Sequence, residues 1–203
     1  DIPFFGWYYP PIFFFVAVAI AMLPCLPGLV AWQAASFAPF AVVVRHIAGH
    51  NLALLALAAF PGCFVNLGHG QNGFLTAALM GGGLLALERR PLAAGVLFGA
   101  LAYKPQFGIL LPLALLAGRH YRSFAAAAAM VLALAALSAL AFGIDSWRAF
   151  LEWSPITRAM VLEQGGLGWE KIQSVFSVVR SAGGSVALAY ALQAAVSLPV
   201  LAA

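Results

Sequence analysis

The stretch FAAAAAMVLALAALSALAFGI, residues 124–144, decides the fold class of this chain because Ser138 is its only polar side chain. An α-helix needs about 20 consecutive apolar residues to cross the hydrocarbon core of a bilayer. Outside this stretch, no Asp, Glu, Lys or Arg occurs between Asp1 and Arg45 or between Arg45 and Glu88. These runs lack the alternating pattern of membrane β-strands. The sequence therefore predicts an all-α, polytopic membrane protein.

The composition supports this prediction. Hydrophobic residues make up 64% of the 203 positions and charged residues 8%, whereas soluble domains have about 45–50% apolar and 25% charged residues. A chain of this size cannot bury so much apolar surface in one aqueous core, so the surface must face lipid. The net charge of +4 comes from short Arg-containing clusters, which are typical of cytoplasmic loops in membrane proteins. We predict membrane lipid as a partner and no binding of nucleic acid.

Pro, Gly and polar runs divide the apolar sequence into about 7–8 membrane helices, some of them short or re-entrant. The expected helices cover residues 11–23, 28–44, 52–67 (disturbed at Pro61), 73–87, 92–103, 106–117, 123–142 and 184–203. We assign residues 1–203 to a single transmembrane domain. It begins without Met and ends inside an apolar run, so we expect a fragment of a longer protein.

Residues 143–183 are predicted to form a luminal or periplasmic loop. Within it, residues 169–181 place Ile172, Val175 and Phe176 on one helical face, together with Val179. A helix with one apolar face is suited to lying in the membrane interface. We therefore expect an interfacial amphipathic helix here.

The basic clusters predict the orientation. Glu88–Arg90 and Arg119–Arg122 are the two basic loops, which the positive-inside rule places in the cytoplasm. Residues 68–72, Lys104 and residues 143–168 then face the periplasm or lumen. If the Tyr-Pro-Pro segment faces the lumen and each of the next three helices spans the membrane, residues 68–72 would lie in the cytoplasm, against this assignment. Either the piece 52–67 is re-entrant or one of the first two helices does not span.

The two apolar pieces around Lys104 are short. Each has about 12 residues and reaches only about 18 Å, less than the roughly 30 Å core. We favour a hairpin of two short helices that leaves Lys104 below the outer surface. The alternative is one helix over residues 92–117, kinked at Pro105, which would put the two Arg clusters on opposite sides.

Lys104 is the first candidate functional residue, because an ionisable group at membrane depth is costly and by default indicates function. Its ammonium suits a phosphate group. The alternative is a lysine that extends to the headgroups from a helix end.

The polar run 66–72 is the second candidate. Its glycines permit a tight turn, and Gln71 and Asn72 open a helix whose first N–H groups can bind an anion. Asn72 has a simpler alternative role as a helix cap. That role does not account for His69 and Gln71, whose side chains suit hydrogen bonds to sugar hydroxyls or phosphate oxygens.

The acidic residues near the carboxyl end are weaker candidates, since solvated carboxylates at helix exits are common. We predict that Glu163 and Lys171 contact substrate from the loop. The sequence contains no Gly-rich phosphate loop and no Cys/His spacing typical of a metal site. We expect no metal site and no cofactor, although the sequence leaves open whether a divalent metal takes part.

Several motifs, in order along the chain, resemble glycosyltransferase family 87, polytopic enzymes of the GT-C superfamily. They are Phe-x-x-Tyr-Tyr-Pro-Pro (5–11), Gly-His-Gly-Gln-Asn-Gly (68–73), Ala-Gly-x-x-x-Gly (94–99), Lys104-Pro105 and the basic turn 118–122. The resemblance implies transfer of a hexose, typically mannose, from a polyprenyl-phosphate donor to a lipid or glycan acceptor. The reaction would occur at the outer face of a bacterial inner or plasma membrane, with the site facing the periplasm.

The resemblance also implies site residues. Binding of the donor phosphate would fall to Tyr9, His69, Gln71, Asn72, Lys104 and Gln106. The adjacency of Gln71 and Asn72 departs from the Gly-Gln-x-Asn pattern of the family. Members resemble one another in using an acidic residue of the first luminal loop as the catalytic base, and Asp1 lies too close to the first helix for this role. We expect the base upstream of this chain.

Two other classes of function remain open from sequence. A secondary transporter also uses broken helices with polar residues at their ends. A non-catalytic membrane subunit is the other class, and it predicts that Lys104, His69 and Gln71 point apart.

Overall fold

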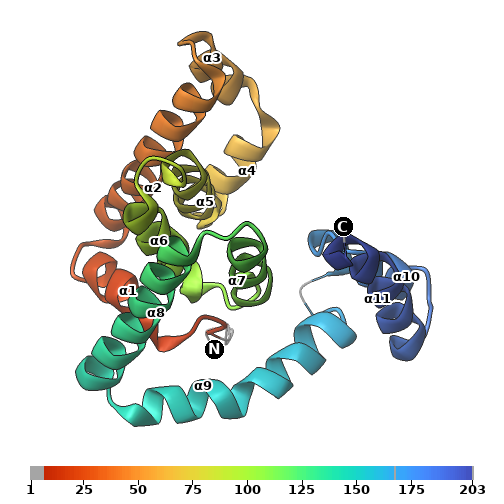
Figure 1. Cartoon of the computed structure of the whole chain (residues 1–203). Helices are drawn as coiled ribbons and strands as arrows, with labels where there is room; N and C mark the ends of the chain where they lie inside the picture. Colours follow the sequence, from red (N-terminus) through yellow and green to blue (C-terminus); the bar gives the residue numbers. More distant parts are fainter. Residues whose placement is uncertain (1–6, 167, 203) are drawn as a thin grey trace. The chain divides into compact units, whose positions relative to one another are not determined.

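The computed structural model describes residues 7–166 and 168–202, and all regular structure in these residues is helical, which confirms the all-α prediction (Figure 1). The chain divides into two compact units, one of residues 9–147 and the other mainly of residues 148–203. The first unit contains η1 (Pro11–Phe13), α1 (Phe14–Ala21), α2 (Cys25–Ala48), α3 (Leu52–Ala59), α4 (Pro61–Gly68), α5 (Gly73–Ala86), α6 (Pro91–Ala100), η2 (Leu101–Tyr103), α7 (Phe107–Ala117) and α8 (Tyr121–Phe142). Then come α9 (Ile144–Thr157), a π-helical turn η3 (Arg158–Glu163), η4 (Trp169–Lys171), α10 (Val175–Ser181) and α11 (Val186–Ala202).

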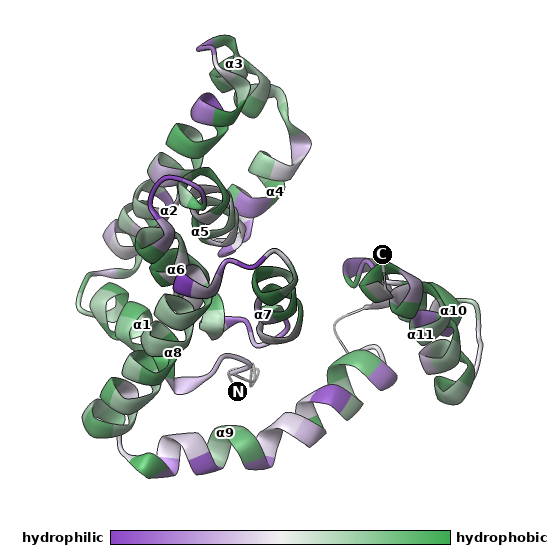
Figure 2. Cartoon of the chain, viewed as in Figure 1, coloured by the Kyte–Doolittle hydropathy of each residue, from purple (hydrophilic) through white to green (hydrophobic). Residues whose placement is uncertain are grey.

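Among the residues that the structure describes, two helices, α2 and α8, are long and apolar enough to cross a membrane. They have 24 and 22 residues, or about 36 and 33 Å at about 1.5 Å per residue. In the most apolar 18-residue stretch of each helix, only 11% and 6% of the residues are buried within the protein. The core helix of a water-soluble domain would be mostly buried, so neither helix has that role. Leu140 of α8, for example, is 84% exposed. The colours of Figure 2 show that the residues of α8 are mostly hydrophobic, whereas α9 contains many more hydrophilic ones.

Small residues bring the helices of the first unit into close contact. Gly81 of α5 lies against Val43 of α2, and Gly83 lies against the ring of Phe98 in α6. In lipid, helices associate largely through such close packing of small residues. Helix α5 is therefore enclosed between α2 and α6.

The contact between α6 and α8 is of the same kind. A Cβ at Gly99 would lie 2.7 Å from both the carbonyl oxygen of Ala127 and the Cβ of Met130, and one at Gly95 would lie even closer to the carbonyl oxygen of Ser123. The Ala-Gly-x-x-x-Gly motif therefore forms the face on which α6 meets α8.

These contacts fix the helix directions. Gly70, just before α5, contacts Trp32 of α2, and Gly81 near the end of α5 contacts Val43, so α5 runs parallel to α2. The turns after α5 and α7 lie together, since His120 Nε2 is 3.9 Å from Glu88 Oε1. The two basic loops thus share one end of the first unit, as the charge pattern predicts.

Helix α1 is too short to span the bilayer. With η1 it covers Pro11–Ala21, about 16 Å. The ring of Phe13 lies 6.2 Å from that of Trp32, and Ile20 lies against Gly28, so α1 runs antiparallel to the first part of α2. Of the two alternatives for the amino-terminal helices, the structure has a non-spanning first helix.

The piece 52–67 is broken as well. The chain is extended at Phe60, and Pro61 begins a new helix, giving α3 and α4 of 8 residues each. Proline suits a first helical position because its missing N–H needs no partner there. Together α3 and α4 bring the chain from the end of α2 back to the level of Gln33, whose side chain bonds to Leu67.

The predicted limits of α2, 28–44, are too narrow. Pro27 lies in the first turn, where its N–H is not needed, so the helix begins at Cys25. At the other end it continues past Arg45 and His46 until Gly49, whose φ of 74° ends the helix in the left-handed conformation.

Lys104 lies between two helices and not within one. Its φ and ψ are −118° and 87°, which interrupt helical structure between η2 and α7. This excludes the single kinked helix over residues 92–117 and agrees with the two short helices that the sequence favours.

In the second unit, the continuous amphipathic helix predicted over residues 169–181 is wrong. Ile172 is extended (φ −103°, ψ 98°), and α10 begins only at Val175. Ser174 starts it through a capping box, in which its hydroxyl accepts from the N–H of Ser177 at 3.2 Å. Such local serine bonds compete with a helix that would run through them.

Candidate functional site

The turn between α4 and α5 is organised by Asn66. Its Oδ1 accepts from the N–H of Gly73 at 3.0 Å, and its Nδ2 donates to the carbonyl of Gln71 at 3.1 Å. The side chain of Asn72, in contrast, makes no capping bond to α5. The cap role considered for Asn72 is therefore wrong, and Asn66 has that role.

Helix α2 holds the same turn from the side. Trp32 Nε1 donates to the carbonyl of Gly70 at 3.1 Å, and Gln33 Nε2 donates to that of Leu67 at 2.8 Å. Trp32 lies about 10 Å along α2 from Cys25, so the turn lies beside the interior of a membrane span. Backbone carbonyls at this depth need protein partners, and these side chains supply them.

His69, Gln71 and Asn72 lie together on this turn. His69 and Gln71 are exposed, while Asn72 is only 6% exposed. His69 Nδ1 lies 2.9 Å from the carbonyl of Val65; because a carbonyl can only accept, Nδ1 carries the proton and Nε2 is the nitrogen that can meet a ligand.

A hydrogen-bonded chain links the start of α5 to η2. The hydroxyl of Thr76 lies 3.0 Å from the carbonyl of Asn72 and 2.7 Å from the hydroxyl of Tyr103. Tyr103 directly precedes Lys104. These hydrogen bonds therefore join the residue before the candidate lysine to the start of α5, which follows the turn.

An aromatic cluster completes the connection to the amino-terminal motif. The ring of Phe13 stacks on that of Tyr103 at 4.9 Å, and Tyr9 lies 4.8 Å from Phe13 and 6.3 Å from Tyr103. Phe13 also meets the edge of Trp32. Three segments far apart in sequence, around residues 9–13, 66–76 and 103–104, thus meet in one place.

Lys104 is the cation of this cluster. Its side chain is half-buried, and its Nζ lies 5.9 Å from the ring centroid of Tyr103. Burial lowers the pKa of the ammonium below its ordinary value. Gln106 is exposed in the same turn. A half-buried cation beside neutral hydrogen-bonding groups is suited to an anionic ligand such as a phosphate.

The family model of glycosyltransferase family 87 matches residues 7–203. The chain belongs to glycosyltransferase family 87. This is a GT-C type family, so the protein is a membrane glycosyltransferase that acts on a sugar donor and an acceptor. No curated protein and no solved structure matches the chain.

The two loop residues proposed for this family 87 enzyme belong to the second unit. The carboxylate of Glu163 accepts from Tyr190 Oη at 2.9 Å and lies 3.4 Å from Arg158 Nε. Its carbonyl accepts two bonds from Arg180, whose guanidinium lies over the ring of Trp169. These contacts hold the turn after η3 together. Lys171 is exposed.

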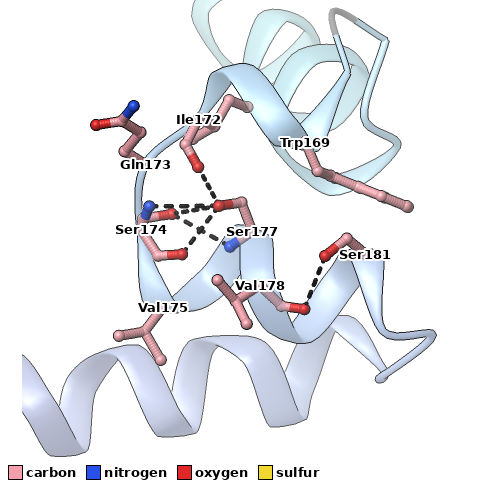
Figure 3. Close-up of a pocket in the computed structure, with 8 residues that line it drawn as sticks. All are labelled: Trp169, Ile172, Gln173, Ser174, Val175, Ser177, Val178 and Ser181. Atoms are coloured by element: carbon pink, nitrogen blue, oxygen red, sulfur yellow. Dashed lines mark hydrogen bonds between the residues drawn. The ribbon is translucent and has the colours of Figure 1, made fainter.

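The second unit of the transferase also has an open pocket of about 490 Å³ along α10 (Figure 3). It is lined by Trp169, Ile172, Gln173, Ser174, Val175, Ser177, Val178 and Ser181. The hydroxyl of Ser177 bonds to Ile172 and Ser174, and that of Ser181 bonds to Val178. With no ionisable side chain in its lining, this pocket does not provide charge for a phosphate.

Sequence reasoning missed four supporting residues, namely Trp32, Gln33, Thr76 and Tyr103, and it did not assign the capping role to Asn66, which lies in the candidate run 66–72. The available signal was the presence of polar side chains within apolar runs, which are costly unless they have partners. Among the described residues, no group of three or more His, Cys, Asp or Glu forms a metal-binding arrangement.

Proposed function

We propose that this glycosyltransferase moves a hexose, with mannose as the first candidate, from a polyprenyl-phosphate donor to a lipid or glycan acceptor. Lys104 binds the donor phosphate with Tyr9, Asn72 and Gln106, while His69 and Gln71 bind the sugar or the phosphate oxygens. The observation that carries the proposal is the link from Asn72 through Thr76 to Tyr103, next to Lys104.

The chemistry follows from these groups. In glycosyl transfer from a lipid phosphate, the bond from the anomeric carbon to the phosphate oxygen breaks, and negative charge develops on the leaving group. An ammonium already in place stabilises this charge without reorganisation. The acceptor hydroxyl must lose a proton, and an acidic residue of the luminal loop before the Tyr-Pro-Pro helix is the proposed base.

Charge supports an outward-facing site. Arg45, Arg89 and Arg122 lie toward one end of the first unit, which the positive-inside rule assigns to the cytoplasm. Lys104 closes the opposite end of α6. We infer that the site opens toward the periplasm of a bacterial inner or plasma membrane. Glu163 and Lys171 of the second unit are proposed as substrate contacts of the loop in their own right.

The test is sugar transfer by the full-length enzyme in lipid nanodiscs, with radiolabelled polyprenyl-phosphate mannose as donor. Lys104→Ala should reduce kcat/KM about 10²–10³-fold, the loss typical of removing one group that stabilises a developing oxyanion. Arg122→Ala is the matched control, because it removes an exposed positive charge from the other end of the unit.

Two results would count against the proposal. Near wild-type transfer by a correctly inserted Lys104→Ala enzyme would remove Lys104 from the site. Transfer from a nucleotide-sugar but not from the polyprenyl-phosphate donor would overturn the donor class. Donors carrying glucose or galactose test the choice of mannose in the same assay.

A further inference from the structure

We propose that Tyr103 is a positioning residue, whose hydroxyl fixes Lys104 relative to the start of α5 through Thr76. The inference rests on the proposed role of Lys104 in binding the donor phosphate. It adds a pair of residues to that site that act through Lys104 and Asn72 and need not touch substrate.

The direction of the two hydrogen bonds follows from the atoms available. The Thr76 hydroxyl has a single proton, and the carbonyl of Asn72 at 3.0 Å can only accept it. The Tyr103 hydroxyl, 2.7 Å away, must therefore donate to Thr76 Oγ1. Both protons are used in one direction, from Tyr103 through Thr76 to the backbone of Asn72.

The backbone at Lys104 leaves helical geometry directly after η2. Its N–H donates to the carbonyl of Leu101 at 2.8 Å and its carbonyl accepts from the N–H of Phe107 at 3.1 Å, so both bonds stay within the same short segment of the chain. Tyr103 is different, since its ring is 4% exposed and stacks on Phe13. Because neighbouring Cα atoms are about 3.8 Å apart, fixing Tyr103 also fixes the origin of the Lys104 side chain.

The hydroxyl has a role separate from that of the ring. The ring contacts with Phe13 and Tyr9 orient η2 within the aromatic cluster. The hydroxyl bond adds a polar link to Thr76 of α5, one helical turn after Asn72, beside the apolar contacts that Leu75 and Leu79 make with the same cluster. Removing the hydroxyl while keeping the ring should therefore make the distance between Lys104 and the start of α5 more variable. We expect a small effect on folding.

The experiment compares Tyr103→Phe, Thr76→Val and Thr76→Ser in the full-length enzyme, with polyprenyl-phosphate mannose as donor. We expect Tyr103→Phe and Thr76→Val to lower kcat/KM for the donor about five- to tenfold, the usual scale for one hydrogen bond. Thr76→Ser keeps the hydroxyl and should restore near wild-type values. The acceptor KM should stay unchanged in all three variants.

A double-mutant cycle with Lys104→Ala separates positioning from general damage. If Tyr103 acts through Lys104, then Tyr103→Phe should change kcat/KM less than about twofold in the Lys104→Ala background. Ser138→Ala serves as a control, because it removes the side-chain hydrogen bond between Trp147 Nε1 and Ser138 Oγ elsewhere in the unit. We expect it to leave donor kinetics unchanged.

The possible failures are distinguishable. If Lys104→Ala itself leaves transfer unchanged, the proposed function of Lys104 fails. If Lys104→Ala is impaired but Tyr103→Phe is not, or if the two effects are fully additive, the positioning role is overturned. Equal losses in Thr76→Ser and Thr76→Val would also overturn it, since the hydroxyl would then not be the group that matters.

Discussion

Gly99→Ala should destabilise the enzyme by separating α6 from α8. The new Cβ would lie 2.7 Å from the carbonyl oxygen of Ala127 and 2.7 Å from the Cβ of Met130, about 0.7 Å short of the 3.4 Å at which ordinary contact begins. Neither atom is at the end of a flexible side chain, so the helices themselves must move. Overpacking of this kind costs about 1–3 kcal/mol, against roughly 0.5–1 kcal/mol gained by replacing glycine in a helix.

The midpoints of these two ranges leave a net loss of about 1 kcal/mol, which corresponds to a fall in Tm of about 2–4 °C for a chain of this size. The assay is thermal unfolding of the purified enzyme in detergent, followed by tryptophan fluorescence. Gly108→Ala is the matched control, because a Cβ at this position of α7 meets no atom within 4 Å. It should leave Tm unchanged or raise it slightly. If both variants unfold at the same temperature, close packing through Gly99 is not what holds α6 to α8.

Two further predictions concern the site. Asn66→Ala should lower stability by about 1–2 kcal/mol, because it leaves Gly73 N–H without its cap and the Gln71 carbonyl without its donor; Asn72→Ala should cost less, and equal Tm values for the two variants would contradict the capping assignment. Burial favours the neutral form of Lys104 and lowers its pKa, so kcat/KM should fall as pH rises, with a midpoint below that of an exposed lysine. Lys104→Arg stays charged across this range and should lack the alkaline decline, and a wild-type profile that stays flat through the lysine range would contradict the prediction.

The backbone breaks were largely predictable. Pro24, Pro61 and Pro105 each lie where one helix ends or another begins, because proline cannot donate the hydrogen bond that would continue a helix. Pro27 and Pro39 show the limit of the rule. Pro27 lies in a first turn, where it is tolerated, and α2 continues through Pro39 although proline removes one hydrogen bond there.

The candidate site was only half predictable. His69, Gln71 and Lys104 could be selected as candidates because polar residues stand out in an apolar chain, and their role in binding stays a prediction. The sequence did not predict which of the two asparagines caps α5. A cap from Asn66 requires the chain to fold back over seven residues. No local pattern distinguishes that geometry from the simpler cap by Asn72.

The polar residues Trp32 and Gln33 of α2 also show how the turn before α5 depends on distant parts of the sequence. Gln33 lies within a span long enough to cross the membrane, where an amide side chain without a partner is costly. Its Nε2 bonds to Leu67, and Trp32 next to it bonds to Gly70, so both serve carbonyls of the turn that a helix would have satisfied internally. A polar pair inside a membrane helix thus indicates a neighbouring break in helical structure. In this transferase that break carries the residues proposed to bind the donor. The side chains that supply hydrogen bonds to its irregular backbone are therefore also the ones that hold the candidate site in place.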